Sequence, residues 1–171
     1  MAIQVGIIED EKQIRESLQL LINGSEGFSC VHSFSNAEDA LAALPDLSLD
    51  VVLTDINLPG MSGIECIAMI KDKCPATNFL ICTSFEDSEN VFKALKAGAT
   101  GYLTKTTQPS KLLDSITEIY NGGSPMNTHI ARKIVLSFNE TNHNTELQKL
   151  SKREQDILEF LSKGLRYKEI A

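Results

Sequence analysis

Five side chains with complementary chemistry follow the apolar runs of this 171-residue chain. They are Glu9 and Asp10 after the first run, Asp55 after the third, Thr83 at the end of the fourth, and Lys105 just after the fifth. Three carboxylates brought to one place repel one another strongly unless a cation joins them. Oxygen ligands suit a hard ion, and proteins bind Mg²⁺ through carboxylates, waters and a phosphate. These residue types therefore predict a magnesium site that handles phosphate.

Asp55 is the natural nucleophile of this set. A carboxylate can accept a phosphoryl group to form an acyl phosphate, as in aspartyl-phosphate enzymes. The Lys105 ammonium would contact the phosphoryl oxygens as a point charge, and Mg²⁺ would offset the charge of the transferring group. Each residue alone has a simpler explanation as a turn residue, a helix cap or a surface lysine. All of them would lie at one edge of a single sheet if the apolar runs are its strands, and this agreement favours the chemical interpretation.

Five strand-like runs alternate with helix-length amphipathic segments along the chain. The runs are Ile3–Ile8, Phe28–Phe34, Val51–Thr54, Phe79–Cys82 and Gly101–Leu103. Several are nearly continuous in Val, Ile and Leu, which is typical of a parallel sheet covered by helices on both faces. The alternation predicts an α/β fold with a doubly wound, five-stranded parallel sheet. In such sheets the functional site lies outside the carboxyl ends of the strands, where the five side chains fall.

Helix boundaries have their own signals in the sequence. Ser35-x-x-Glu38 and Ser62-x-x-Glu65 are capping-box patterns that predict two helix starts. Pro109 suits the first turn of another helix. Gly98 and Gly122 suit helix ends.

The charge distribution divides the chain into an acidic body and a basic tail. Residues 1–124 carry 8 Lys and Arg against 17 Asp and Glu, residues 125–146 carry 2 against 2, and residues 147–171 carry 6 against 4. A helix-like stretch, Thr128–Phe138, precedes a polar run, Asn139–Asn144, that has the composition of a linker. We expect a domain over 1–124, a linker with a helix over 125–146, and a third part over 147–171. The basic tail is the part suited to face a polyanion.

Cysteines, histidines and hydropathy exclude several other classes of site. The cysteines (Cys30, Cys66, Cys74 and Cys82) have neither a C-x-x-C nor a zinc-ligand spacing. We expect Cys30 and Cys82 to pack as small hydrophobes in strands, and we expect the three histidines, His129 among them, to be ordinary residues. No apolar run approaches the ~18 residues of a membrane span, and the N-terminus lacks the features of a signal peptide. We therefore expect a cytoplasmic protein without a membrane partner.

The stretches that carry the chemistry resemble a receiver domain of two-component response regulators. They read VGIIEDE over 5–11, VLTDINLPGMSG over 52–63, CTS over 82–84 and GATGYLTK over 98–105. The similarity covers about residues 3–122 and implies a flavodoxin-like receiver fold. The resemblance also implies roles for individual residues, namely Asp55 as phosphoacceptor, Mg²⁺ held by Glu9, Asp10, Asp55 and the backbone carbonyl of Asn57, phosphoryl contacts from Thr83 and Lys105, and Tyr102 as the switch aromatic.

Tyr102 and two departures from the family pattern leave alternatives open. The family's aromatic switch ring turns inward when the residue at the Thr83 position moves, but Tyr102 could also be a plain strand aromatic. Glu9 stands where many receivers have Asp, which keeps the charge but lengthens the side chain. Thr106 stands where many receivers have Pro after a cis peptide bond. A cis bond to Thr106 would cost about 3 kcal/mol more than trans, so the sequence leaves the isomer open.

The tail, Leu150–Ala171, resembles the start of a LuxR-type helix-turn-helix domain. It opens with a third capping box, Ser151-x-x-Glu154. Together with the predicted linker helix, the tail implies the NarL/FixJ class of transcriptional regulators. The alternative is an amphipathic surface helix. Base edges are read by the second helix of this motif, so we expect these residues alone, an incomplete all-α segment, not to recognise a DNA sequence.

The resemblance implies a phosphorylation-controlled switch rather than an enzyme. We expect a sensor histidine kinase as phosphoryl donor, a homodimer on activation, and DNA as the partner of a full-length C-terminal domain. The switch would act through Thr83, Tyr102 and a helix over Glu86–Ala97. At most, we expect self-catalysed phosphoryl uptake and slow autodephosphorylation.

Two other functions use related chemistry. A haloacid-dehalogenase-like phosphatase needs a second acid two residues after its nucleophile, where this chain has Asn57. A flavodoxin-like flavin carrier needs a hydroxyl- and Gly-rich phosphate loop after the first strand, where this chain has three acidic residues, 9–11. A receiver that signals without phosphate is a further alternative, which the intact acidic set disfavours.

Overall fold

A computed structural model describes residues 1–141 of the chain. The strands are β1 (Ile3–Ile8), β2 (Phe28–Phe34), β3 (Val51–Thr54), β4 (Asn78–Thr83) and β5 (Gly101–Thr104). The helices are α1 (Lys12–Asn23), α2 (Ala37–Ala43), α3 (Gly63–Ile70), α4 (Ser88–Ala97), α5 (Pro109–Tyr120) and α6 (Thr128–Thr141), with a 3₁₀ turn at Leu44–Asp46. Contacts divide the chain into Met1–Ile130 and Ala131–Ala171, so α6 crosses the division.

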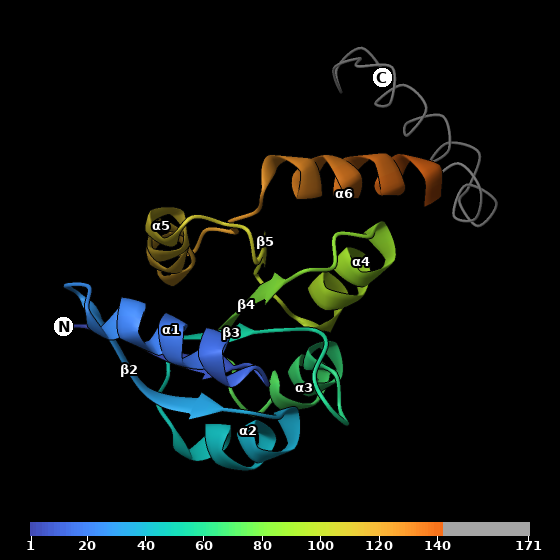
Figure 1. The fold of residues 1–171 in the computed structure, drawn as a ribbon. Coiled ribbons are helices and arrows are strands. Elements are labelled where there is room, and N and C mark those ends of the chain that lie inside the picture. Colours follow the sequence, from blue (N-terminus) through green and yellow to red (C-terminus); the bar gives the residue numbers. More distant parts are fainter. Residues whose placement is uncertain (142–171) are drawn as a thin grey trace. The chain divides into compact units, whose positions relative to one another are not determined.

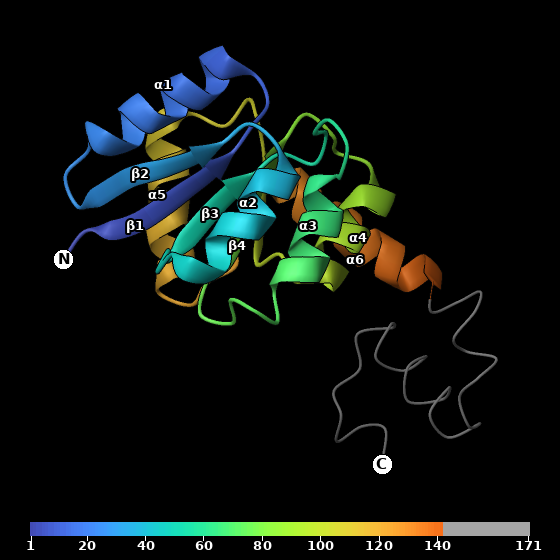
Figure 2. The same ribbon diagram turned by 90° about the horizontal axis from the view of Figure 1, so that it is seen from below.

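The five strands form one parallel sheet in the order β2-β1-β3-β4-β5. The predicted doubly wound fold is confirmed. Helices α1 and α5 cover one face of the sheet, and α2, α3 and α4 cover the other (Figures 1 and 2). The chain leaves β1 toward β2 and then returns to build β3, β4 and β5 on the opposite side. The strand order therefore reverses between β1 and β3, and the carboxyl ends of these two strands are where a site is expected.

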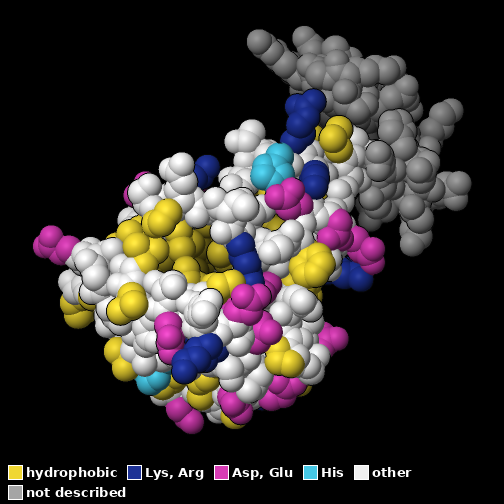
Figure 3. Space-filling view, in the orientation of Figure 1, with side chains coloured by type: hydrophobic (Ala, Val, Ile, Leu, Met, Phe, Trp, Pro, Cys, Tyr) yellow, Lys and Arg dark blue, Asp and Glu magenta, His cyan; other side chains and the backbone are white. Residues whose placement is uncertain are grey.

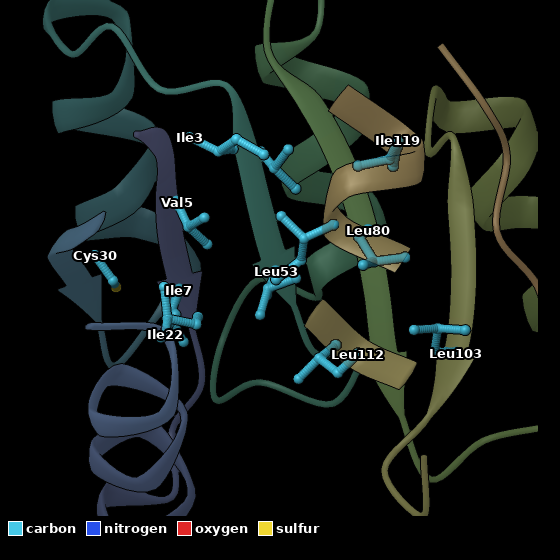
Figure 4. Packing of buried hydrophobic residues seen from close by; sticks show 12 residues of the cluster. Ile3, Val5, Ile7, Ile22, Cys30, Leu53, Leu80, Leu103, Leu112 and Ile119 are labelled. Atoms are coloured by element: carbon cyan, nitrogen blue, oxygen red, sulfur yellow. The ribbon is translucent and has the colours of Figure 1, made fainter. Parts of the chain in front are cut away.

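The core beneath α1 and α5 is built from alternate residues of the central strands. Figure 4 shows side chains of β1, β3, β4 and β5 that pack with residues of α1 and α5. The cluster includes Val5, Ile7, Ile22, Leu53, Leu80, Leu103, Leu112, Ile116 and Ile119, none of them more than 4% exposed. Burial of one such side chain contributes about 1.5–3 kcal/mol. This packing fixes the strand ends that carry the acidic and basic side chains.

Most predicted helix boundaries are confirmed, and the predicted start of α2 is wrong. Ser62 and Glu65 form the predicted capping box of α3, α5 begins at Pro109, and α4 ends at Gly98 with φ +124°. The cap of α2 is Asn36 and not Ser35, because the Asn36 side chain accepts a hydrogen bond from the N–H of Asp39. Asn and Ser cap helices about equally well. Helix α5 ends at Tyr120, and Gly122 follows the C-cap residue Asn121 with φ +93°, so this glycine stands at the helix end as predicted.

The predicted linker helix is confirmed and is longer than expected. Helix α6 runs to Thr141 and includes the first three residues of the predicted polar run, because no Gly or Pro stops it after Phe138. The remaining linker residues, the third capping box and the segment 147–171 lie outside the described residues. Among residues 1–141, no helix combines the length and apolarity that a membrane crossing requires.

Candidate functional site

Glu9, Asp55 and Lys105 meet at the carboxyl edge of the sheet. Nζ of Lys105 lies 2.8 Å from Oδ2 of Asp55 and 3.0 Å from Oε2 of Glu9. The two carboxyl side chains are only 3% and 5% exposed. Strands β1 and β3 are neighbours in register, and the N–H of Asp55 donates to the carbonyl of Ile8. The expected convergence of these three residues is therefore confirmed.

Asp10 joins the two buried carboxylates to form an acidic cluster. Glu9, Asp10 and Asp55 each offer one oxygen, and these oxygens all lie within 4.8 Å of one another. Asp10 is exposed, so the cluster opens to solvent on its side. Lys105 is the cation that bridges two of the three carboxylates, which leaves negative charge in excess. An all-oxygen donor set with excess negative charge fits Mg²⁺.

Burial and the Lys105 ammonium act on the protonation of this cluster in opposite directions. Burial raises the pKa of Glu9, although hydrogen bonds from Lys105 and from the N–H of Glu11 lower it in part. Burial alone would lower the pKa of Lys105, but its hydrogen bonds to Asp55 and Glu9 outweigh this effect and raise it. Lys105 therefore remains an ammonium at neutral pH and supplies a fixed positive charge beside Asp55.

The loop after β3 holds Asp55 by close backbone packing. The N–H of Asn57 donates to Oδ1 of Asp55 over 3.3 Å, and the N–H of Gly63 donates to the carbonyl of Ile56 over 3.0 Å. A Cβ at Gly63 would lie 2.0 Å from the backbone oxygen of Asp55. The start of α3 can approach Asp55 this closely because residue 63 has no side chain. Asn57, the expected carbonyl ligand, follows Asp55 by two residues, and its side chain is exposed.

Thr83 and Tyr102 are linked through the backbone of Phe85. Thr83 is fully buried, and its hydroxyl accepts a long hydrogen bond of 3.5 Å from the N–H of Phe85. The Tyr102 hydroxyl donates to the carbonyl of Phe85 over 2.6 Å, and the ring is fully buried. Burial also raises the pKa of the Tyr102 phenol. The N–H of Lys105 donates to the carbonyl of Thr83, so the ends of β4 and β5 are joined beside the acidic cluster.

Several features of the site could not be identified from the sequence. The guanidinium of Arg15 donates to the backbone carbonyls of Glu9 (2.8 Å) and Asp10 (3.4 Å), which holds the acidic loop in place. No pattern in the sequence indicates this contact, because Arg15 binds backbone carbonyls, which every residue has. The peptide bond between Lys105 and Thr106 is trans. The predicted switch helix begins two residues later than expected, because Asp87 caps α4.

An apolar cavity of about 140 Å³ adjoins the acidic cluster. Side chains of β1, β3, α1 and α5 line it together with Glu9, Asp55, Cys82 and Lys105. Figure 3 shows a hollow with apolar walls between the positions of α1 and α5, with basic and acidic side chains beside it.

Cys82 is partly exposed, unlike Cys30, which is buried as expected. Burial raises the pKa of the Cys82 thiol to about 11, so this thiol is not a thiolate nucleophile at neutral pH.

Comparison with known proteins identifies the family. Residues 5–117 match the response regulator receiver domain. The transcriptional regulatory protein YxjL of Bacillus subtilis (strain 168) is 32% identical over 99% of this chain and 79% of its own length. The nitrate/nitrite response regulator protein NarL of Escherichia coli (strain K12) is 29% identical over 96% of this chain and 77% of its own length.

A solved structure of a LuxR-family two-component response regulator from Aurantimonas sp. SI85-9A1 shares this fold. It has a TM-score of 0.75 and 30% sequence identity, and the match covers 81% of this chain and 99% of that one. The match to the receiver family spans most of the described residues, and the relatives align along nearly the whole chain. The chain therefore belongs to the two-component response regulators, in the group that contains the NarL- and LuxR-type transcriptional regulators.

Proposed function

We propose that Asp55 is the phosphoacceptor of this response regulator. The observation that carries the proposal is the position of Asp55, a nearly buried carboxylate that contacts the Lys105 ammonium and stands beside two further acids. A carboxylate oxygen of Asp55 attacks the phosphorus atom of a phosphohistidine. The P–N bond breaks, its electron pair returns to the imidazole, and an acyl phosphate forms. The Lys105 ammonium, which contacts the Asp55 carboxylate before the transfer, then contacts the oxygens of the bound phosphoryl group.

The acidic cluster is proposed to hold Mg²⁺ through Glu9, Asp10, Asp55 and the carbonyl of Asn57. Bound Mg²⁺ supplies positive charge that offsets the oxygens of the transferring phosphoryl group. Other residues of the chain hold these ligands in position. Arg15 fixes the loop that carries Glu9 and Asp10, and the close packing of Gly63 fixes the loop that carries Asp55.

Replacement of Asp10 by Asn is expected to weaken Mg²⁺ binding by roughly tenfold. The variant loses one negative ligand, and because Asp10 is exposed the change should leave the fold intact. Calorimetric titration with Mg²⁺ measures the affinity. Asp114→Asn on the exposed surface of α5 is the matched control, because it removes the same charge away from the cluster. Equal affinity of Asp10→Asn and the wild type would exclude Asp10 as a ligand.

A phosphatase is the alternative function that would use the most similar residues. Its general acid would stand at position 57, and Asn57 carries an amide, which cannot exchange a proton in that way at neutral pH. We therefore propose that the chain takes up one phosphoryl group and does not turn over phosphomonoesters. Steady release of more than one phosphate per chain from a phosphomonoester would contradict this proposal.

We propose a sensor histidine kinase as donor, a homodimer as the activated form, and DNA as the target of the complete protein. Relatives along nearly the whole chain are named as transcriptional regulators, which supports the DNA proposal. Residues 147–171, which resemble the start of a helix-turn-helix, lie outside the described part of the chain. Light scattering before and after phosphorylation tests the dimer.

The experiment that tests the proposed function is intact-mass measurement after incubation with a small acyl-phosphate donor. With Mg²⁺ we expect one phosphoryl adduct on each chain, and with a chelator we expect none. Uptake of equal extent with and without Mg²⁺ would contradict the proposed site, because the acidic cluster repels a phosphate when no cation is bound.

A further inference from the structure

The segment Pro125–Ile130 lies along the outer edge of β5. The N–H of Tyr102 donates to the carbonyl of Pro125 over 3.0 Å, and Tyr102 forms a parallel bridge with Met126. The N–H of Thr104 donates to Oδ1 of Asn127 over 2.9 Å. Since β5 is the last strand of the sheet, these contacts satisfy backbone groups that an edge strand leaves open. The segment is therefore docked on the strand that carries Tyr102, the predicted switch aromatic, and leads into Lys105.

The same segment also contacts the loop between β4 and α4. Nε2 of His129 lies 3.3 Å from Oε1 of Glu86, a distance that allows an ion pair when the imidazole is protonated. The next residue, Ile130, is fully buried. No pattern in the sequence indicates that His129 has a partner, because Glu86 lies more than forty positions away. The loop and the segment thus form a second contact beside the β5 edge.

A short chain of contacts joins this docked segment to Thr83, whose carbonyl accepts a hydrogen bond from the N–H of Lys105, the residue that contacts Asp55. The carbonyl of Phe85 accepts a hydrogen bond from the Tyr102 hydroxyl, and the N–H of Phe85 donates one to the Thr83 hydroxyl. Glu86 is the next residue in the chain. The Phe85–Thr83 hydrogen bond is long, at 3.5 Å, and is easily lost. If a phosphoryl group on Asp55 draws the Thr83 hydroxyl toward itself, this bond breaks and the backbone at Phe85 and Glu86 can shift.

We propose that the segment Pro125–Ile130 senses the state of Asp55, and that phosphorylation weakens its contacts with β5 and with Glu86. The inference rests on the proposed function, because it requires an acyl phosphate at Asp55. Coupling between two sites is reciprocal. Weaker docking of the segment must therefore favour the phosphorylated arrangement to the same extent as phosphorylation weakens docking.

Two amide protons report directly on the docked segment. The N–H groups of Tyr102 and Thr104 face Pro125 and Asn127, whereas the N–H of Leu103, between them, faces β4 by the alternation of a strand. With Mg²⁺ and beryllofluoride as the acyl-phosphate mimic, we expect amide exchange of Tyr102 and Thr104 to accelerate by roughly threefold or more. Exchange of Leu103 should change little.

Two outcomes of this exchange experiment would overturn the inference. Unchanged exchange at Tyr102 and Thr104, with bound beryllofluoride visible in the fluorine spectrum, would refute the sensing segment and leave the proposed function standing. Absence of bound beryllofluoride at saturating Mg²⁺ would contradict the proposed function, and the inference would fall with it. The fluorine spectrum therefore tells the two failures apart.

Substitutions in the segment test the reciprocal effect. The double variant Asn127→Ala with His129→Ala removes one contact to β5 and one to Glu86. We expect it to bind beryllofluoride roughly threefold more tightly than the wild type. Glu16→Ala is the matched control, because it removes another exposed ion pair, Lys12–Glu16 on α1, and should leave the affinity unchanged. Equal or weaker affinity of the double variant would overturn the proposal.

Discussion

Asp55→Asn is expected to abolish phosphoryl uptake from an acyl-phosphate donor. The amide oxygen of Asn is a poor nucleophile, and attack through it cannot form an acyl phosphate. The substitution keeps the size of the side chain and removes one of three clustered negative charges. Because Lys105 keeps its partner Glu9, we expect the variant to fold. Intact-mass measurement under the conditions that label the wild type shows the loss.

The control for this result is Asp114→Asn, which makes the same chemical change on the surface of α5 and should be labelled like the wild type. Thermal unfolding of both variants confirms that a loss of labelling reflects the missing carboxylate. Stoichiometric, persistent labelling of Asp55→Asn would show that another residue accepts the phosphoryl group.

Gly63→Ala is expected to lower the free energy of unfolding by about 3 kcal/mol or more. The added Cβ would lie 2.0 Å from the backbone oxygen of Asp55 and 3.0 Å from Oγ1 of Thr54. The nearest of these atoms belongs to the backbone, so relief requires α3 and the Asp55 loop to separate. That movement displaces Asp55, and we also expect weaker Mg²⁺ binding. Urea unfolding and Mg²⁺ titration measure the two effects.

Gly27→Ala separates steric contact from backbone strain. Gly27 has φ +91°, but a Cβ there would meet no atom within 4 Å. We expect this control to cost about 1–2 kcal/mol from the left-handed backbone alone, with no change in Mg²⁺ binding. If Gly63→Ala were no more destabilising than Gly27→Ala, the loop that carries Asp55 would not depend on close packing against α3.

The sheet and the convergence at its edge could be predicted because they depend on strong, repeated signals. Buried parallel strands require continuous apolar runs, and the residue after each run must lie at the same edge of the sheet. Glu9, Asp55 and Lys105 therefore meet, although each is about fifty residues along the chain from the one before it. The register of β1 and β3 follows from the hydrophobic pattern, and this register sets two acids side by side.

The parts that could not be predicted depend on single contacts. Asn36 and Ser35 are about equally good caps, so the sequence cannot decide which one begins α2. The hydrogen bonds of Arg15 to the acidic loop, and the approach of His129 to Glu86, involve exposed or partly exposed polar side chains with no periodic pattern. The docking of Pro125 and Met126 on β5 depends on backbone groups, which every sequence has in common.

The most direct test of Asp55 as the phosphoacceptor is to locate the phosphoryl group on the labelled wild-type chain by peptide mapping. We predict one Mg²⁺-dependent adduct, on the peptide that contains Asp55, and its removal by hydroxylamine, as expected of an acyl phosphate. An adduct on Glu9 or Asp10, or an adduct that hydroxylamine leaves intact, would contradict Asp55 as the phosphoacceptor.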